Sequence, residues 1–456
     1  MGELFDKLTE YVNNEVYPFH MPGHKRQLVW MENPYNYDIT EINGFDDLHN
    51  PTGVLRNLCN DFQSLYGNGK VVFTVNGSTV GILSGISAVV DNGDTILIGR
   101  NCHKSVYNAA LIRKTNIEYI YPETDNELGI SMEIKAEDVA RKFYENPKIK
   151  AVVITTPTYE GIISDVKAIA EVVHLNDAKL IVDGAHGAHL GIVNGQSLTN
   201  MGADIVIMSI HKTLPAFTQS SIVWVKDDKA LINEVEKYIH IYESSSPSYL
   251  LMCGAEKCLE FISQKDVIKN YIDMITEFRK KALKLNKLFV FSPSCEFDIG
   301  KIVIGTTRTS ISGEDLKNLL LDKYKIELEM ASENYALAMS SVADSKEGFD
   351  QLINALIEID NALECENPKV FEGMKFPSKE VEIFQADKME KTLTRMDDAK
   401  GKLSGDFIFA YPPGIPWVVP GEIISDDVIN QIIRYREIGI DVRGIFDGDK
   451  IWTIER

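Results

Sequence analysis

Between about residue 70 and residue 225 the chain repeats one pattern, in which a short apolar run is followed by a turn and a helical stretch. The apolar runs are VVFTV (71–75), TILI (95–98), IEYIY (117–121), AVVITT (151–156), KLIVD (179–183), DIVIMS (204–209) and SIVWV (221–225). Most lack polar alternation, which is typical of strands covered on both faces. Strands that alternate with helices favour a mostly parallel sheet with helices on either side. The pattern therefore predicts an α/β fold around a seven-stranded sheet.

The pattern changes beyond residue 225. Residues 265–288 have helical periodicity and are expected to link the sheet to a smaller domain. Charged residues 376–402 are interpreted as solvated helix faces and loops. Short strands alternate with helical stretches in between, which indicates an α+β lobe; the expected strands are 301–306 and 335–340, and the expected helices are 313–324 and 346–364.

The N-terminal residues differ again in composition. Residues 1–16 predict a short amphipathic helix, and the Asn/Pro/Gly-rich residues 17–55 predict an extended arm. We therefore expect a helix and arm at 1–55, a large domain at 56–290 and a small C-terminal α+β domain at 291–456. A length of 456 residues fits this division, because single cores rarely grow past ~250–300 residues.

Composition narrows the range of partners and compartments. With a formal net charge of −20, the surface should repel nucleic acid and anionic membranes and attract small cations. No apolar run approaches the ~20 residues that a membrane helix needs. The six cysteines are scattered without a CxxC pair, so we expect reduced thiols in a cytoplasmic protein.

Polar residues follow five of the expected strands directly. Ligands of parallel sheets bind at the carboxyl ends of the strands, so these residues should line one pocket. They are Asn76-Gly77-Ser78-Thr79, Asn101-Cys102-His103-Lys104, Pro157-Thr158-Tyr159-Glu160, Asp183-Gly184-Ala185-His186 and Ser209-Ile210-His211-Lys212.

The first of these turns is a candidate phosphate site. NGST (76–79) opens the helical run VGILSGISAVV, and a helix N-terminus offers free backbone N–H groups beside two hydroxyls. The alternative is that Ser78 or Thr79 only caps that helix. The turn has neither the GxGxxG spacing of dinucleotide-binding proteins nor the GxxxxGK[ST] spacing of phosphate-binding loops.

Asp183 and Lys212 extend the candidate chemistry. A carboxylate that ends a buried strand is costly unless it meets a cation or a protonated ring nitrogen. A desolvated lysine has a lowered pKa and can attack a carbonyl, although a salt bridge is the alternative for a single lysine. A phosphate site, a partner for a ring nitrogen and a Schiff-base lysine together describe a pyridoxal phosphate pocket.

Nine stretches then carry a family resemblance. The chain resembles the ornithine/lysine/arginine decarboxylases built on the aspartate aminotransferase fold, which is fold type I of the pyridoxal phosphate-dependent transferases, in their short bacterial form. The matching stretches are PFHMPGHKR (18–26), DITEINGFDDLHNPTGVL (38–55), NGST (76–79), NCHKS (101–105), TTPTYEGI (155–162), VDGAHGAH (182–189), SIHKTLPAFTQ (209–219), SSPSYLLM (245–252) and YPPGIPWVVPGE (411–422).

The resemblance implies a role for each matching position. Lys212 is the lysine that bonds to the cofactor aldehyde, Asp183 pairs with the pyridine nitrogen, and His103 stacks on the ring. The phosphate is held by Ser78, Thr79, Ser209 and His211. Ala185 packs beneath the ring, and His186 lies near its phenolic oxygen or the substrate carboxylate. Ser246 reaches the phosphate of a neighbouring subunit, so a homodimer or a higher homo-oligomer with sites at the subunit interface is expected.

The implied reaction is the decarboxylation of arginine, lysine or ornithine to an amine. The cationic tail of such a substrate needs carboxylate partners. The candidates are Glu41, Asp46, Asp47, Glu160 and Glu422, each with a solvated loop or a helix cap as its alternative role. No motif separates the three substrates. The rigid YPPGIPWVVPGE segment is suited to closing over a pocket, and its alternative is a plain domain connector.

Three other functions are compatible with parts of this pattern. The same fold and cofactor serve aminotransferases, racemases and eliminating lyases, which differ in the substrate clamp. Asp183, His186 and His189 form a D-x-x-H-x-x-H run that could hold the metal of a hydrolase, although no HExxH or comparable spacing occurs. A non-catalytic relative is the third, but Lys212, Asp183 and His103 are all present.

Overall fold

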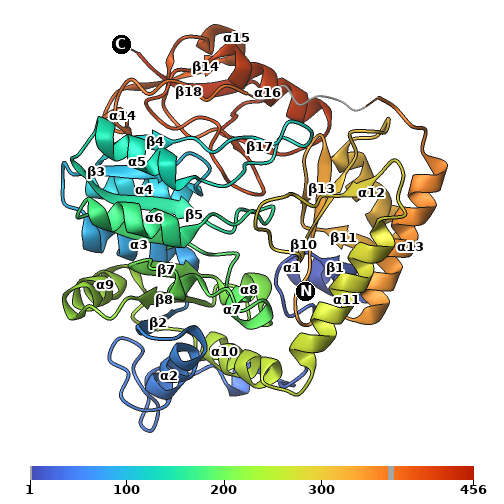
Figure 1. Cartoon of the computed structure of the whole chain (residues 1–456), viewed down its shortest axis with the longest axis horizontal. Helices are drawn as coiled ribbons and strands as arrows, with labels where there is room; N and C mark the ends of the chain where they lie inside the picture. Colours follow the sequence, from blue (N-terminus) through green and yellow to red (C-terminus); the bar gives the residue numbers. More distant parts are fainter. Residues whose placement is uncertain (1–2, 368–373, 456) are drawn as a thin grey trace.

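The computed structural model describes residues 3–367 and 374–455 and is built around one large sheet (Figure 1). The strands of this sheet are β2 (Lys70–Thr74), β3 (Thr95–Gly99), β4 (Asn116–Ile120), β5 (Ile149–Thr155), β6 (Lys179–Asp183), β7 (Ile205–Met208) and β8 (Ser221–Val225). Their spatial order is β2-β8-β7-β6-β5-β3-β4. β8 runs antiparallel to β2 and β7, whereas all other neighbours are parallel. The predicted fold class is therefore confirmed.

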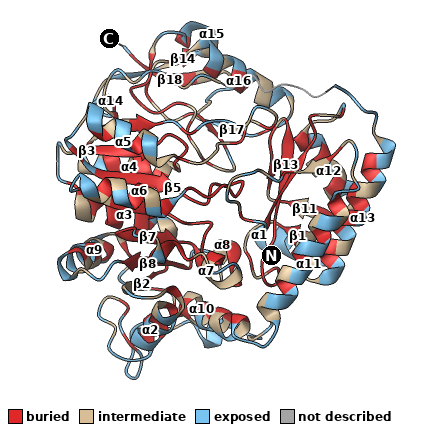
Figure 2. Cartoon of the chain, viewed as in Figure 1, coloured by how far each residue is buried: buried red, intermediate tan, exposed pale blue. Residues whose placement is uncertain are grey.

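Helices cover both faces of the large sheet. Successive side chains of a strand point to opposite faces, so in β5 Ala151 and Val153 join one hydrophobic cluster and Val152 and Ile154 join another. The helices on the Ala151 face are α3 (Gly77–Val89), α4 (Lys104–Arg113) and α9 (Lys229–Tyr242); those on the Val152 face are α2 (Val54–Tyr66), α5 (Ala136–Glu145), α6 (Val166–Leu175) and α10 (Tyr249–Ile262). Figure 2 shows the strands buried between these layers.

A second part of the chain forms a four-stranded antiparallel sheet with its own helices. The strands are β9 (Phe289–Val290), β10 (Lys301–Gly305), β12 (Met330–Ala331) and β13 (Tyr335–Met339), in the order β12-β13-β10-β9. The helices are α11 (Val267–Ala282), α12 (Gly313–Tyr324) and α13 (Lys346–Ala362). α11 connects the two sheets, as its periodicity predicts. The boundary predicted after residue 290 falls at the end of β9, which pairs with β10.

The C-terminal residues pack as a third part around a separate hydrophobic cluster. The prediction that residues 376–402 contain only helix faces and loops is wrong, because Lys391–Arg395 form an edge strand whose side chains are mostly exposed. The elements are α14 (Ile383–Ala386), β14 (Lys391–Arg395), α15 (Met396–Ala399), β15 (Leu403–Ser404), β16 (Phe409–Ala410), α16 (Asp426–Glu437), β17 (Val442–Arg443) and β18 (Lys450–Ile454).

The N-terminal arm lies between the first two parts. β1 (Tyr17–Phe19) pairs in parallel with β11 (Ile326–Leu328) of the second part. The amide of Gly23 donates a hydrogen bond to the carbonyl of His211, 2.8 Å away. The remaining short elements are α1 (Glu3–Asn13), η1 (Pro34–Asn36), α7 (Leu190–Val193), η2 (Leu198–Asn200) and α8 (Ile210–Thr213). The arm therefore links the second sheet to the segment that follows β7.

Two further findings concern the helices and the cysteines. None of the helices in residues 3–367 and 374–455 is long and apolar enough to cross a membrane. All six cysteines lie in these ranges, and each is a free thiol.

Candidate active site

The polar residues after the five strands line one pocket with a volume of about 620 Å³. The carboxyl ends of parallel strands share one sheet edge, which brings these residues together. The other walls come from the arm, the second part and the residues 410–417. Nine of the residues predicted to serve catalysis or cofactor binding line the pocket: Ser78, Thr79, His103, Asp183, Ala185, His186, Ser209, His211 and Lys212.

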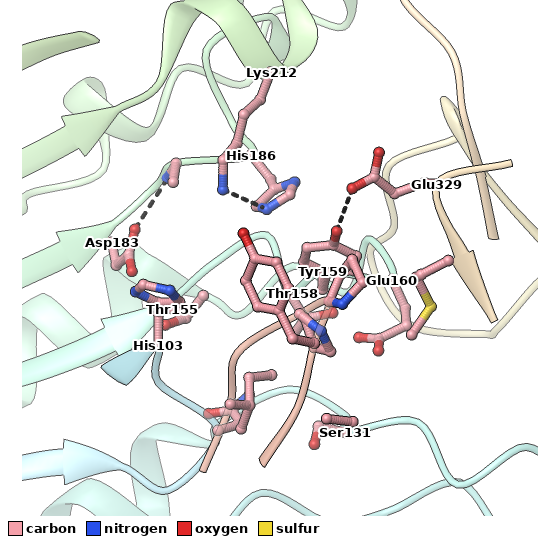
Figure 3. A pocket seen from close by; sticks show the side chains of 18 of the residues that line it. His103, Ser131, Thr155, Thr158, Tyr159, Glu160, Asp183, His186, Lys212 and Glu329 are labelled. Carbon is pink, nitrogen blue, oxygen red and sulfur yellow. Dashed lines mark hydrogen bonds between the residues drawn. The ribbon is translucent and has the colours of Figure 1, made fainter. Parts of the chain in front are cut away.

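Asp183 and Lys212 come from adjacent strands, because β6 ends in Asp183 and Lys212 lies in the short helix α8 after β7. Burial raises the pKa of Asp183, while the nearby Lys212 acts against this. Burial lowers the pKa of Lys212, although Asp183 and Glu329 favour its charged form. Lys212 Nζ lies 3.1 Å from His186 Nε2, and Figure 3 shows the amine between Asp183 and His186. The pair thus supplies a carboxylate and a nucleophilic amine.

Three histidines near Lys212 are uncharged at neutral pH. Burial lowers the pKa of His103 to about 4, with contributions from Lys212 and Lys104. Burial also lowers the pKa of His211 to about 4 and that of His186 well below its usual value. His103 caps α4, and its Nδ1 accepts a hydrogen bond from the amide of Ser105 at 3.2 Å. Neutral imidazoles leave Lys212 without a cationic histidine beside it.

The turn after β2 and the hydroxyl of Ser209 offer groups that suit an anion. The N-cap of α3 is Asn76, whose side chain makes no capping hydrogen bond, so neither Ser78 nor Thr79 caps the helix. The buried Oγ of Ser209 has no hydrogen-bond partner among the described residues. A buried hydroxyl without a partner is uncommon in proteins, and here it lines the pocket. Together with Asp183 and Lys212, these groups fit the phosphate, ring nitrogen and aldehyde of pyridoxal phosphate.

The five candidate substrate carboxylates lie in different places, and most of them are not in the pocket. Glu160 lines the pocket, and its Oε1 accepts a hydrogen bond from the hydroxyl of Tyr335 at 2.9 Å. Asp46 accepts hydrogen bonds from backbone amides at the start of α2, including that of Gly53 at 2.6 Å. Glu41 and Asp47 are exposed, and Glu422 is buried against Arg100. Only Glu160 of the five belongs to the pocket lining.

Sequence reasoning missed a second pocket carboxylate, Glu329. It lies between β11 and β12, and its two oxygens accept hydrogen bonds from the hydroxyl of Tyr159 and from the amide of Met21 at 2.8 Å. Figure 3 shows Glu160 and Glu329 on the side of the pocket opposite to Asp183. A single Glu between two short strands gives no sequence signal.

The proline-rich segment forms the roof of the pocket, as predicted. We define the roof segment as residues 411–417, of which Tyr411, Pro412, Pro413, Ile415, Pro416 and Trp417 line the pocket. Arg100 fixes this segment by donating hydrogen bonds to the carbonyls of Pro416 at 2.6 Å and Trp417 at 3.0 Å.

The remaining predicted residues lie outside this arrangement. Ser246 is exposed and does not line the pocket of its own chain. His189 Nε2 lies 3.1 Å from Asp298 Oδ1, whereas His186 points toward Lys212. Within residues 3–367 and 374–455, no group of three or more His, Cys, Asp or Glu side chains is arranged to hold a metal ion.

Comparisons with known proteins find relatives that match this chain along almost its whole length. An arginine decarboxylase of Bacillus subtilis (strain 168) is 29% identical over 97% of this chain and 95% of its own length. The uncharacterised protein YaaO of the same organism is 30% identical over 97% of this chain and 95% of its own length. Both alignments span nearly the whole of each protein.

Solved structures share the fold at lower identity. The lysine decarboxylase LdcF of Francisella novicida superposes with a TM-score of 0.78 at 18% identity, covering 99% of this chain and 83% of that chain. The constitutive lysine decarboxylase of E. coli gives a TM-score of 0.75 at 19% identity, covering 90% and 73%. This is the fold of pyridoxal phosphate-dependent enzymes of fold type I.

Two family models match the chain. The model described as "Orn/Lys/Arg decarboxylase, major domain" matches residues 3–334. The model described as "Orn/Lys/Arg decarboxylase, C-terminal domain" matches residues 372–446. The two domains occur in order and cover most of the sequence, so the chain belongs to the Orn/Lys/Arg decarboxylase family.

Proposed function

We propose that this protein uses pyridoxal phosphate to decarboxylate a basic amino acid and that the pocket around Lys212 is its active site. The observation that carries the proposal is the opposed placement of two kinds of groups in one pocket. Lys212 and Asp183 stand at the sheet edge, and the carboxylates of Glu160 and Glu329 stand across from them. When bound, the cofactor supplies a ring that accepts the electron pair left by the departing carbon dioxide.

The residues at the sheet edge have defined tasks in this proposal. Lys212 holds the cofactor through its amine, and Asp183 keeps the ring nitrogen protonated. Ser209, Ser78 and Thr79 bind the phosphate at the N-terminus of α3. His103, as a neutral imidazole, would cover one face of the bound ring, and Ala185 would cover the other. The small side chain of Ala185 leaves room for a flat ring.

Glu160 and Glu329 are suited to a cationic substrate tail. Burial raises the pKa of Glu160. No salt bridge joins Glu160 or Glu329 to a lysine or arginine within the described residues. Glu160 is buried and Glu329 is half-buried. A carboxylate removed from water is costly unless a cation pairs with it, and the ammonium or guanidinium of the substrate supplies such a partner. Two carboxylates in one wall favour a basic amino acid over an acidic or apolar one.

His186 and Lys212 are positioned to manage the proton that replaces the lost carboxylate. Their nitrogens are 3.1 Å apart, so a proton can pass directly between Nε2 and Nζ. Once Nζ carries this proton, the ammonium of Lys212 can protonate the substrate carbon and returns to its neutral form. The ring of Tyr159 packs edge-on against His186, with ring centroids 4.8 Å apart, and limits the movement of the imidazole.

The proposal includes a homodimer in the cytoplasm. Ser246 is exposed and does not line the pocket of its own chain, which suits a contact with a neighbouring subunit. The apolar side chains on α1 are more than half exposed: Leu4, Phe5, Leu8 and Val12. Exposed apolar patches of this kind mark protein interfaces. The free thiols are compatible with a reducing compartment.

The first experiment combines spectroscopy with product analysis. The visible spectrum of the purified protein with pyridoxal phosphate is recorded beside that of Lys212→Ala, before and after adding arginine, lysine and ornithine in turn. We expect an absorption band that needs Lys212 and changes with one amino acid, together with equal amounts of carbon dioxide and the matching amine. Arginine is tested first, because the near-full-length relative is named an arginine decarboxylase. Formation of a keto acid instead would identify an aminotransferase and contradict the proposal.

A further inference from the structure

Lys301 is a buried lysine that contacts His186 from outside the pocket. It begins β10 in the second sheet and is 1% exposed. Its Nζ lies 2.7 Å from His186 Nδ1, on the opposite side of the imidazole from Lys212. Lys301 does not belong to the pocket lining. The three side chains therefore form a line in which His186 joins two lysine amines.

The surroundings of Lys301 are shaped to hold its side chain in this place. Gly161 has a φ of +108°, and a Cβ at this position would lie 2.7 Å from Lys301 Cγ. The stem of the lysine thus occupies space that only glycine leaves free. Tyr159 closes another side, with Nζ 6.0 Å from its ring centroid.

Charged groups on several elements face the Lys301 amine. Burial lowers its pKa to about 8, and Lys212 acts in the same direction. Three carboxylates oppose this shift, namely Asp298, Glu329 and Glu160. Asp298 is itself held by His189 and by the amide of Gly300, 2.9 Å from its Oδ1. At pH 7 Lys301 is therefore an ammonium.

The direction of the hydrogen bonds then determines the protonation states of His186 and Lys212. An ammonium only donates, so Nδ1 of His186 must accept from Lys301. A neutral imidazole that accepts at Nδ1 carries its proton on Nε2. That N–H faces Lys212, whose amine must accept and is consequently neutral. A neutral amine is the form of lysine that can attack an aldehyde.

We propose that Lys301 is a positioning residue of this active site, which sets the tautomer of His186 and exchanges one proton with Lys212 across the imidazole. In the transfer, an N–H bond of Lys301 breaks as an Nδ1–H bond forms. The Nε2–H bond breaks as a new N–H bond forms on the lone pair of Lys212. Lys301 ends as a neutral amine, Lys212 as an ammonium and His186 as the other neutral tautomer.

This inference rests on the proposed function, because it assigns Lys212 its nucleophilic form. It adds the amine of Lys301 as a proton donor and acceptor, which lies outside the pocket lining and is shielded from solvent. This amine keeps Lys212 neutral before reaction and returns a proton to it afterwards. The two nitrogens of the His186 ring connect the two amines directly.

The test reads the tautomer of His186 in the apoprotein by NMR with ¹⁵N-labelled histidine, and His186→Gln assigns the signals. We expect the Nε2–H form in the wild type and in Lys301→Arg, which keeps a donor. In Lys301→Met we expect a shift toward the Nδ1–H form, because Lys212 retains its proton and donates to Nε2. Lys25→Met is the matched control: Lys25 is also buried, but it donates to the carbonyls of His20 and Met339 instead.

A second readout measures Lys212 directly. Trace acetylation of the apoprotein over a pH series, quantified by peptide mass spectrometry, gives the pKa of its amine. In Lys301→Met we expect this pKa to rise by about one unit, since a neighbouring positive charge is lost. Lys25→Met should leave it unchanged.

Three outcomes would overturn the inference: a wild-type His186 protonated on Nδ1, a tautomer that is unchanged in Lys301→Met, or an equal shift in Lys25→Met. Both readouts use the apoprotein, so they decide the role of Lys301 independently of the reaction. Decarboxylation with an unchanged tautomer would remove this inference alone. The expected tautomer shift without decarboxylation of any basic amino acid would remove the proposed function alone.

Discussion

Arg100 and Glu422 form an ion pair across two parts of the chain, with Nη2 2.9 Å from Oε2 and both side chains completely buried. Arg100 directly follows β3, and Glu422 follows the roof segment. The same guanidinium donates to the carbonyls of Pro416 and Trp417 and lies 4.8 Å from the ring centroid of Phe376. One buried side chain therefore connects the large sheet to the roof of the pocket.

Removing Glu422 should destabilise the fold strongly. Glu422→Ala leaves the buried guanidinium without its counter-charge, and we expect a loss of about 3–5 kcal/mol in the free energy of unfolding. Urea denaturation followed by fluorescence measures it. Asp273→Ala, which breaks the exposed pair with Lys269, is the control and should leave the midpoint unchanged. The double variant Arg100→Met/Glu422→Leu should be more stable than Glu422→Ala, because neither charge stays buried; a lower midpoint would contradict this.

Ser209→Ala should weaken the binding of pyridoxal phosphate without lowering the stability of the apoprotein. The Ser209 hydroxyl is buried without a partner, so its removal should leave apoprotein stability equal or higher. The affinity for pyridoxal phosphate should fall about tenfold, because one phosphate hydrogen bond is lost. Thermal melts and absorbance titrations measure the two effects. Ser84→Ala is matched, since its hydroxyl is also buried without a described partner but lies outside the pocket lining. Equal cofactor affinity in both variants would rule out the phosphate role.

Glu160→Gln and Glu329→Gln should weaken substrate binding. Each change removes the charge of a carboxylate that lines the pocket while keeping the size of the side chain. We expect the KM for the basic amino acid to rise about 30-fold or more, as for the loss of one partner in a buried charge pair. Steady-state kinetics measure it. The controls are Glu41→Gln and Asp47→Asn, whose side chains are exposed, and their KM should match that of the wild type.

Acid should destabilise the apoprotein through His103. Its pKa is about 4 in the folded protein, because burial disfavours the imidazolium, against about 6.5 in the unfolded chain. Between these values only the unfolded chain takes up the proton, so the stabilisation is complete above pH 6.5 and is lost as the pH falls toward 4.

The measurement compares urea denaturation at pH 7 and pH 5. We expect the free energy of unfolding to fall by about 2 kcal/mol less in His103→Gln than in the wild type between pH 7 and pH 5, since the glutamine does not titrate. His240→Gln is the control, because this histidine is exposed in the folded chain and should follow the wild type. An identical loss in His103→Gln and wild type would show that His103 is not held neutral.

Much of the sheet and of its polar edge could be predicted from sequence for a physical reason. Strands covered on both faces need continuous apolar runs, so each strand can be predicted from its own residues. KLIVD and DIVIMS are examples. The residues that follow parallel strands share one edge of the sheet, so the sequence predicts that Asp183 and Lys212 lie together.

Other features depend on distant pairing and leave no local pattern. Glu422 is one of the five candidate substrate carboxylates, each with a loop or a helix cap as its alternative, but it pairs with Arg100, which lies far away in sequence. Asp46 was another such candidate, and it accepts hydrogen bonds from backbone amides at the start of α2. Glu329 and Lys301 reach the site from a second sheet. The edge strand β14 is mostly exposed, so its sequence is polar and does not predict a strand. Tertiary contacts alone select these residues.

The roof of the pocket has a consequence for how the protein is made. Residues 411–417 come after Asp183 and Lys212 in the chain, and all of these residues line the same pocket. During synthesis the sheet edge therefore leaves the ribosome before the roof segment does. Until Glu422 has also emerged, the guanidinium of Arg100 lacks its counter-charge. The pocket is thus incomplete until the roof segment and Glu422 have both been made.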